Sequence, residues 1–109
     1  MKTLEKLFIK AEKSGNANIN GRIIEHDFGY VYKGDIESKY RVTVSDNILT
    51  LEHWGTETLK INILTKEIIE YYGESVSDRD SMNYTLSYFG VNGKFRYFPS
   101  KEKFTLELS

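Results

Sequence analysis

The residues best suited to acid–base chemistry are the two histidines, His26 and His53, because both have acidic neighbours. Glu25 and Asp27 flank His26, and Glu52 precedes His53. A histidine beside a carboxylate is the minimal acid–base pair. Adjacent residues of a strand point to opposite faces, however, so Glu52 and His53 meet only with help from another strand. We therefore interpret both histidines as surface or cross-strand residues and predict no catalytic centre.

Sequence patterns for other kinds of chemistry are missing. The chain has no cysteine, which excludes disulfides and thiolate metal sites, and its histidines lack the spacing of a metal-binding pair. It also lacks a Ser-His-Asp order, a phosphate-binding loop and a dinucleotide-binding glycine pattern. We expect a protein that is not an enzyme and that holds no metal and no cofactor.

The most polar stretch of the chain, residues 73–80, lies where a predicted strand gives way to a predicted helix. Backbone amides at a helix N-terminus bind anions, and Arg79 could add a forked donor. Three acids, Glu74, Asp78 and Asp80, would repel an anion, so helix capping is the favoured interpretation. The same acids could also bind calcium. This pattern is weak evidence, because the glycine-containing ligand loop of a calcium site is absent.

Aromatic residues alternate along one predicted strand, at Phe28, Tyr30 and Tyr32, and so project from one face. Such a row could stack on bases of single-stranded nucleic acid, or it could face the core. Lys33 is the one base beside it among several acids, so attraction to phosphate is poor. Exposed tyrosine is also favoured at protein-binding surfaces.

Lys94 and Arg96 occupy alternate positions of the C-terminal segment, so both are predicted to project from one face of the hairpin and to make it basic. If it adjoined the lysines at positions 2, 6 and 10 the two would form a basic stripe, although scattered solvated lysines are more common. The complete set of candidate binding residues is Phe28, Tyr30, Tyr32, His53, Trp54, Glu74, Asp78, Arg79, Asp80, Lys94 and Arg96.

Two helices are predicted to help position these residues. Apolar residues at positions 4, 7, 8 and 11 recur at helical spacing and predict an amphipathic helix over residues 3–13, which Gly15 ends. A second helix is predicted over residues 79–89, with Ser77 or Asp78 as its N-cap and Gly90 at its end.

Short β-type segments fill most of the remaining chain. Turns are predicted at residues 46–47, 55–56 and 65–66, and a helix over residues 65–72 stays open as an alternative to the last strand of the meander. A hairpin follows the second helix, with its loop at residues 99–102. The predicted strands of the meander span residues 19–25, 28–33, 39–45, 48–54, 57–64 and 67–72. This order predicts an α+β fold: a twisted antiparallel β-sheet, made of the meander and the C-terminal hairpin, packed on one face by two α-helices.

Size and charge favour one cytoplasmic domain over residues 1–109. The 109-residue chain has a charged N-terminus and lacks the run of about 20 apolar residues that a membrane span needs. Residues 1–24 carry five basic and two acidic side chains, residues 25–80 six and twelve, and residues 81–109 four and two. The acidic middle is unlike a uniformly basic nucleic-acid binder.

Residues 51–57 and 72–79, followed by Asn83 and Leu86, resemble small uncharacterised proteins of phages and mobile elements. The resemblance implies an accessory protein that acts against a host system. We expect a non-catalytic protein-binding module that inhibits or modulates a host defence complex, with a phage or host protein as partner. A single-stranded nucleic-acid-binding domain is the alternative, and a homodimer formed through a sheet edge fits either.

Overall fold

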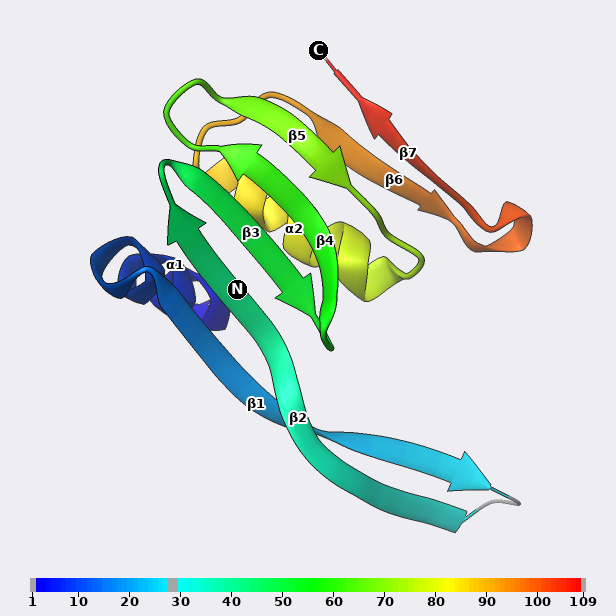
Figure 1. Ribbon diagram of the computed structural model, residues 1–109. Helices are drawn as coiled ribbons and strands as arrows, with labels where there is room; N and C mark the ends of the chain where they lie inside the picture. The colour runs from blue at the N-terminus through cyan, green and yellow to red at the C-terminus, as the bar shows by residue number, and fades with distance from the viewer. Residues whose placement is uncertain (1, 28–29, 109) are drawn as a thin grey trace.

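The computed structural model describes the backbone of residues 2–27 and 30–108 and the side chains of residues 4–19 and 39–108. The α+β fold is confirmed. The described part of the chain contains two α-helices, a five-stranded antiparallel sheet and a two-stranded sheet (Figure 1). The elements are α1 (Lys2–Ser14), β1 (Asn16–Asp27), β2 (Tyr30–Ser45), β3 (Ile48–His53), β4 (Thr56–Asn62), β5 (Glu67–Tyr71), α2 (Val76–Tyr88), β6 (Lys94–Phe98) and β7 (Lys103–Glu107).

The large sheet is a simple meander in which strands β1 to β5 pair in chain order. Two-residue turns with positive φ join the central strands, at Asp46-Asn47 and at Trp54-Gly55. Such turns match the right-handed twist of a hairpin. The first turn is the one predicted, and the second lies one residue earlier than predicted. The last strand, β5, is a strand and not the alternative helix.

Strand β2 corrects the predicted meander, because the strands predicted at 28–33 and 39–45 are one continuous strand of 16 residues. Gly34 and Asp35, which favour a turn, lie instead where the β1–β2 register shifts, between the pairs Arg22↔Ile36 and Ile24↔Lys33. A β-bulge absorbs an extra residue without ending the strand. The turn residues therefore mark an irregularity within a long strand.

The β1–β2 hairpin extends far beyond the rest of the sheet. Strand β3 pairs with residues 40–45 of β2, whereas residues 30–38 pair with β1 alone among the described residues. We call the described part of this projection, residues 20–27 and 30–38, the arm. Figure 1 shows it leaving the globular part of the molecule as a twisted two-stranded ribbon.

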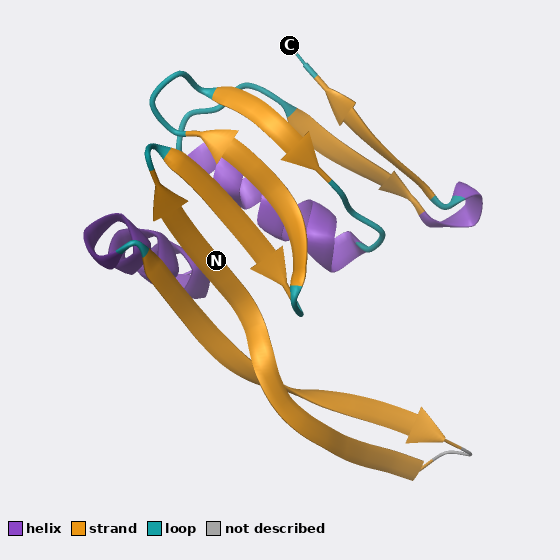
Figure 2. Ribbon diagram, viewed as in Figure 1, coloured by secondary structure: helices purple, strands orange, loops and turns teal. Residues whose placement is uncertain are grey.

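Both helices lie on the same face of the large sheet (Figure 2). Helix α1 packs on β1 and β2, and α2 packs on β4 and β6. Apolar residues predicted to face inward, such as Leu49, Leu51 and Phe8, are fully buried there. The core comprises Leu4, Leu7, Phe8, Ala11, Ala17, Tyr40, Val42, Leu49, Leu51, Leu59, Ile61, Met82, Leu86, Phe89, Val91 and Phe95.

Helix α2 begins three residues earlier than predicted. Its N-cap is Ser75, whose hydroxyl accepts a hydrogen bond from the Asp78 backbone N–H at 3.0 Å. The predicted caps, Ser77 and Asp78, lie in the first helical turn instead. Both Ser and Asp favour caps, so several adjacent candidates made the boundary ambiguous. The helix ends at Tyr88, and Gly90 follows with φ +66°, as the sequence indicates.

The C-terminal hairpin, β6–β7, has the predicted loop, a short 3₁₀ turn at Pro99–Lys101. It corrects the predicted single sheet, because it forms a two-stranded sheet of its own instead of joining the meander. Phe95 of β6 is fully buried, and its ring lies 5.6 Å from that of Phe104 on β7. Gly73 makes room for this hairpin, since a Cβ there would lie 2.4 Å from the Phe104 ring. The hairpin is thus packed against the loop that follows β5.

Candidate binding surface

A buried hydrogen bond joins the end of β3 to the first turn of α2. His53 Nδ1 lies 2.7 Å from Asp78 Oδ1, and the two residues are 9% and 7% exposed. The other carboxylate oxygen of Asp78 accepts a hydrogen bond from the Glu74 backbone N–H at 3.1 Å. Asp78 therefore connects the strand, the loop before the helix, and the helix N-terminus, where negative charge is favourable.

Tyr40 of β2 completes the surroundings of His53. The two rings stack with centroids 4.6 Å apart and an angle of 9° between their planes. Burial raises the pKa of the Tyr40 phenol above its ordinary value; a hydrogen bond with the Ser81 side chain opposes this, and the nearby charges of Asp78 and Asp80 add to it. Tyr40 therefore stays neutral at physiological pH.

This His–Asp pair has the composition of an acid–base dyad, but its position favours a structural role. A general base must reach the substrate proton, either directly or through one water molecule. His53 is buried beneath the Tyr40 ring, and the groove between α2 and β6 has other residues in its lining. The pair therefore ties α2 to the sheet.

The carboxylate that precedes His53 in the sequence is not its partner, as strand alternation predicts. Glu52 lies in the adjacent position of β3 and so points to the opposite face, while the actual partner, Asp78, is 25 residues further along the chain. His53 is also buried, unlike a surface histidine. Strand alternation did hold the signal for its burial, because Leu49, Leu51 and His53 follow one another at a spacing of two.

A groove of about 350 Å³ runs between α2 and β6, and it brings together four of the predicted binding residues. Arg79 and Asp80 come from the helix, and Lys94 and Arg96 come from the strand. The full lining is Arg79, Asp80, Asn83, Lys94, Phe95, Arg96, Tyr97 and Phe98.

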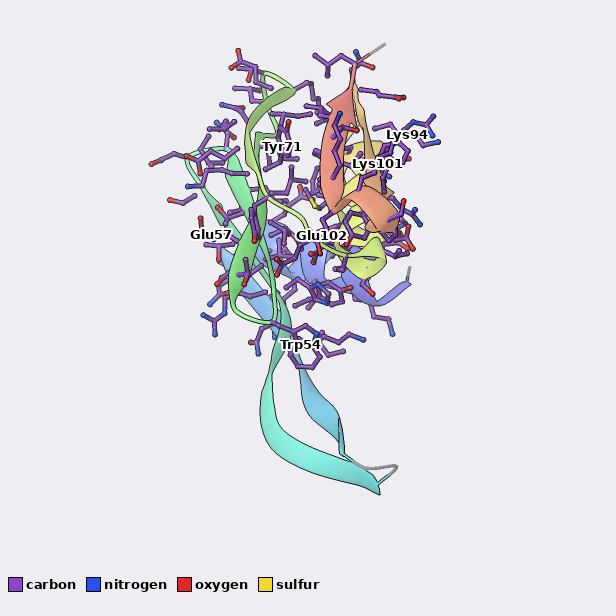
Figure 3. All side chains as sticks on the ribbon, turned by 90° about the vertical axis from the view of Figure 1, so that its right-hand side faces the viewer. Trp54, Glu57, Tyr71, Lys94, Lys101 and Glu102 are labelled. Carbon is purple, nitrogen blue, oxygen red and sulfur yellow. The ribbon has the colours of Figure 1, made fainter. Side chains whose placement is uncertain are left out.

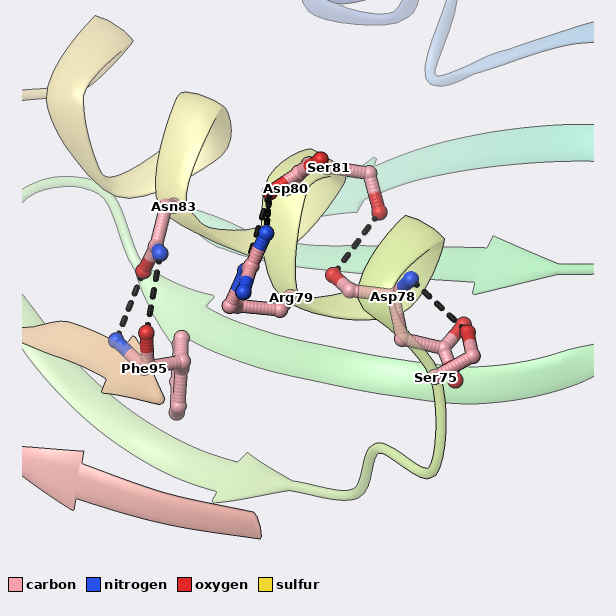
Figure 4. Close-up of polar contacts among 7 residues, drawn as sticks. All are labelled: Ser75, Asp78, Arg79, Asp80, Ser81, Asn83 and Phe95. Atoms are coloured by element: carbon pink, nitrogen blue, oxygen red, sulfur yellow. Dashed lines mark hydrogen bonds and ion pairs between the residues drawn. The ribbon is translucent and has the colours of Figure 1, made fainter. Parts of the chain in front are cut away.

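Local ion pairs reduce the charge of this groove. Arg79 donates from Nε and Nη2 to a single oxygen of Asp80, at 3.0 and 2.9 Å (Figure 4). Arg96 Nε lies 2.8 Å from Glu107 Oε1 on β7. Lys94 forms no ion pair among the described residues. The five charges sum to about +1, so the groove is only mildly basic.

Asn83 is a groove residue that was not among the candidates. Its side-chain amide donates to the Phe95 carbonyl at 3.0 Å, and its oxygen accepts from the Phe95 N–H at 2.7 Å (Figure 4). One side-chain amide thus forms hydrogen bonds with both the N–H and the C=O of a single residue. Periodicity along the chain carries no signal for a contact of this kind.

The other predicted residues lie elsewhere. Tyr30 and Tyr32 lie on the arm, and Phe28 is outside the described residues. Trp54 lies at the end of the globular part from which the arm projects, as Figure 3 shows. Glu74 accepts a hydrogen bond from the Tyr72 hydroxyl at 2.9 Å.

The proposed basic stripe is not formed. Helix α1 packs on β1 and β2, whereas the β6–β7 hairpin lies at the far side of the sheet beside β5 (Figure 1). In the part of the chain that the structure describes, no three histidine or acidic side chains converge as metal ligands would. Neither described helix is long and apolar enough to cross a membrane.

Comparison of the chain with protein families, with curated proteins and with solved structures finds no match. The resemblance to phage and mobile-element proteins therefore stays a prediction.

Proposed function

We propose that this chain is a non-catalytic protein-binding module and that the arm is its principal contact element. The observation that carries the proposal is the extent of β2. Its residues 30–38 continue beyond the sheet and pair with β1 alone among the described residues. An isolated two-stranded hairpin is at best marginally stable in water. A partner that adds a strand to the arm would supply further pairing and stabilise it.

The composition of the arm supports a protein partner over a nucleic acid. Residues 20–38 carry four acidic and two basic side chains, a balance that repels phosphate. The segment also includes Tyr30 and Tyr32, and tyrosine offers a large contact area with little rotamer entropy to lose. An acidic arm suits a basic surface on the partner, with fast and salt-sensitive association.

The internal use of the His53–Asp78 pair supports the non-catalytic part of the proposal. Both side chains already bind elements of the fold, and both are buried. The resemblance to phage and mobile-element proteins implies a host protein complex as the partner and inhibition or modulation as the effect.

Shortening the arm tests this proposal directly. Ile19 of β1 and Tyr40 of β2 are cross-strand partners, so an Asn-Gly turn can replace residues 20–39 and join them. The full and shortened chains, both tagged, would be incubated with untreated and with nuclease-treated lysate of the organism that the protein acts in. Bound proteins would be eluted with salt and identified by mass spectrometry.

We expect the full chain to retain a stoichiometric protein that the shortened chain loses. Equal recovery by both chains would exclude the arm as the contact element. Recovery that disappears with nuclease treatment would replace the proposal with nucleic-acid binding.

A further inference from the structure

The groove beside α2 runs along the edge of β6 that faces away from β7. Asn83 marks this edge, because it binds both the N–H and the C=O of Phe95 from the side opposite β7. In an antiparallel pair, backbone groups point alternately toward the partner strand and away from it. The N–H and C=O of Tyr97, two residues further along β6, therefore point to the same free edge.

The Asn83 carboxamide occupies the place that a peptide group of a neighbouring strand would take. It presents one donor and one acceptor to Phe95, as a paired residue would. The groove continues from Asn83 past Tyr97 of β6, and Arg79 and Asp80 line it on the side of α2. Unpaired polar groups on a strand edge are a template for pairing with another chain.

Cationic donors surround this edge and retain capacity for a ligand. Arg79 uses two N–H groups on one oxygen of Asp80, although a guanidinium has five in all. Arg96 contacts Glu107 through Nε, and Lys94 has no ion pair among the described residues. A carboxylate could therefore be bound without breaking the existing pairs.

We propose that the groove receives a short acidic segment of a partner protein, which extends along the free edge of β6 and continues the pairing begun by Asn83. Its carboxylates would lie near Arg79, Lys94 and Arg96. The inference rests on the proposed protein-binding function and names the chemistry of a second contact. A peptide fits better than a nucleic acid, because a strand edge needs peptide groups to satisfy it.

The test uses a labelled peptide of alternating glutamate and valine, with its binding to the full chain followed by fluorescence anisotropy at low salt. We expect saturable binding that salt weakens. Lys94→Glu and Arg79→Ala should each weaken binding about tenfold, the value of one charge-assisted hydrogen bond. Lys101→Glu is the matched control, since Lys101 belongs to the same hairpin but lies outside the groove lining.

A second pair of variants tests the strand addition itself. Tyr97→Pro removes the edge N–H, which the β6–β7 ladder does not use, whereas Tyr97→Ala removes the ring and keeps the N–H. We expect the proline variant to bind the peptide at least about tenfold more weakly than the alanine variant. Circular dichroism would check that both are folded.

Three results would overturn the inference: no peptide binding, equal losses for Lys94→Glu and Lys101→Glu, or equal affinities of the two Tyr97 variants. Stronger binding of a labelled oligothymidylate would assign the groove to nucleic acid instead. The arm-shortened chain should bind the peptide normally. If the peptide does not bind while the arm still captures a protein from the lysate, this inference is wrong and the proposed function is unaffected.

Discussion

The two hairpins of this chain differ in how they are held. The β6–β7 hairpin has five residues in each strand, yet Phe95 inserts fully into the core and Asn83 fixes its backbone. The β1–β2 hairpin has 12 and 16 residues in its strands, and the arm lies beyond the point where β3 ends its pairing. In the described part of the chain, residues 30–38 of the longer hairpin pair with β1 alone.

This difference indicates that the two hairpins have different roles, one in stabilising the fold and the other in contacting other molecules. A hairpin in a folded protein is stabilised mainly by what it packs against, since its own pairing is marginal. The short hairpin closes the core and adds a groove at its edge. The arm continues beyond the sheet as a long ribbon that other molecules could contact (Figure 1).

Phe95→Ala should have the largest effect. Removal of a fully buried phenylalanine leaves a cavity and costs about 3–5 kcal/mol of unfolding free energy. That is a large part of the stability of a typical domain. Urea unfolding followed by circular dichroism would measure the loss. Phe98→Ala, in the same strand but at a residue that is 44% exposed, is the control and should cost less than about 1 kcal/mol. Similar costs for both would show that the hairpin is not anchored as described.

Asp78→Ala should have the next largest effect. The change leaves the buried His53 ring and the Glu74 N–H without their partner, and a buried polar group left unsatisfied costs about 1–3 kcal/mol. Chemical denaturation would show the loss. Asp80→Ala removes a neighbouring carboxylate whose side chain is 54% exposed, so it should change stability by about 0.5 kcal/mol or less. A cost of Asp80→Ala equal to that of Asp78→Ala would contradict the structural role of the His53–Asp78 pair.

Asn83→Ala should have a smaller and more local effect. It removes two hydrogen bonds to the Phe95 peptide and should lower the unfolding free energy by about 1–2 kcal/mol. Hydrogen exchange would locate the change, with faster exchange of the Phe95 amide and little change in β3. Asn83→Asp keeps an acceptor for the N–H but places a charge beside the carbonyl, so it should restore only part of the protection. An unchanged exchange rate of the Phe95 amide would show that Asn83 does not hold this edge of β6.

Alternation and helical spacing were sufficient to predict most of the fold. They identified α1 and the C-terminal hairpin, since the apolar residues of these elements recur at the spacing of a helix or of a strand, and they favoured a strand over a helix at β5. They failed at Gly34-Asp35, where local turn preference was overridden by long-range pairing with β1. The start of α2 was also misplaced, because Ser75 competes with Ser77 and Asp78 for the cap.

The candidate surface was predictable only one element at a time. Arg79 and Lys94 were each identified from local patterns, but nothing in the sequence indicates that they line one groove. The same is true of His53 and Asp78, which lie on different elements. Contacts between distant segments depend on the three-dimensional path of the chain, and a single sequence does not encode that path in its spacing.

Shortening the arm should have the smallest effect on stability. With an Asn-Gly turn in place of residues 20–39, the unfolding free energy should stay within about 1 kcal/mol of that of the full chain. The reason is that β1 keeps its pairs from Asn16 to Ile19 and Tyr40 keeps its stacking on His53. The shorter connection also costs less closure entropy. Urea unfolding of the two chains would measure the difference. A loss comparable to that of Phe95→Ala would mean that the arm is part of the folded core, and it would then no longer be available to act as a contact element independent of the fold.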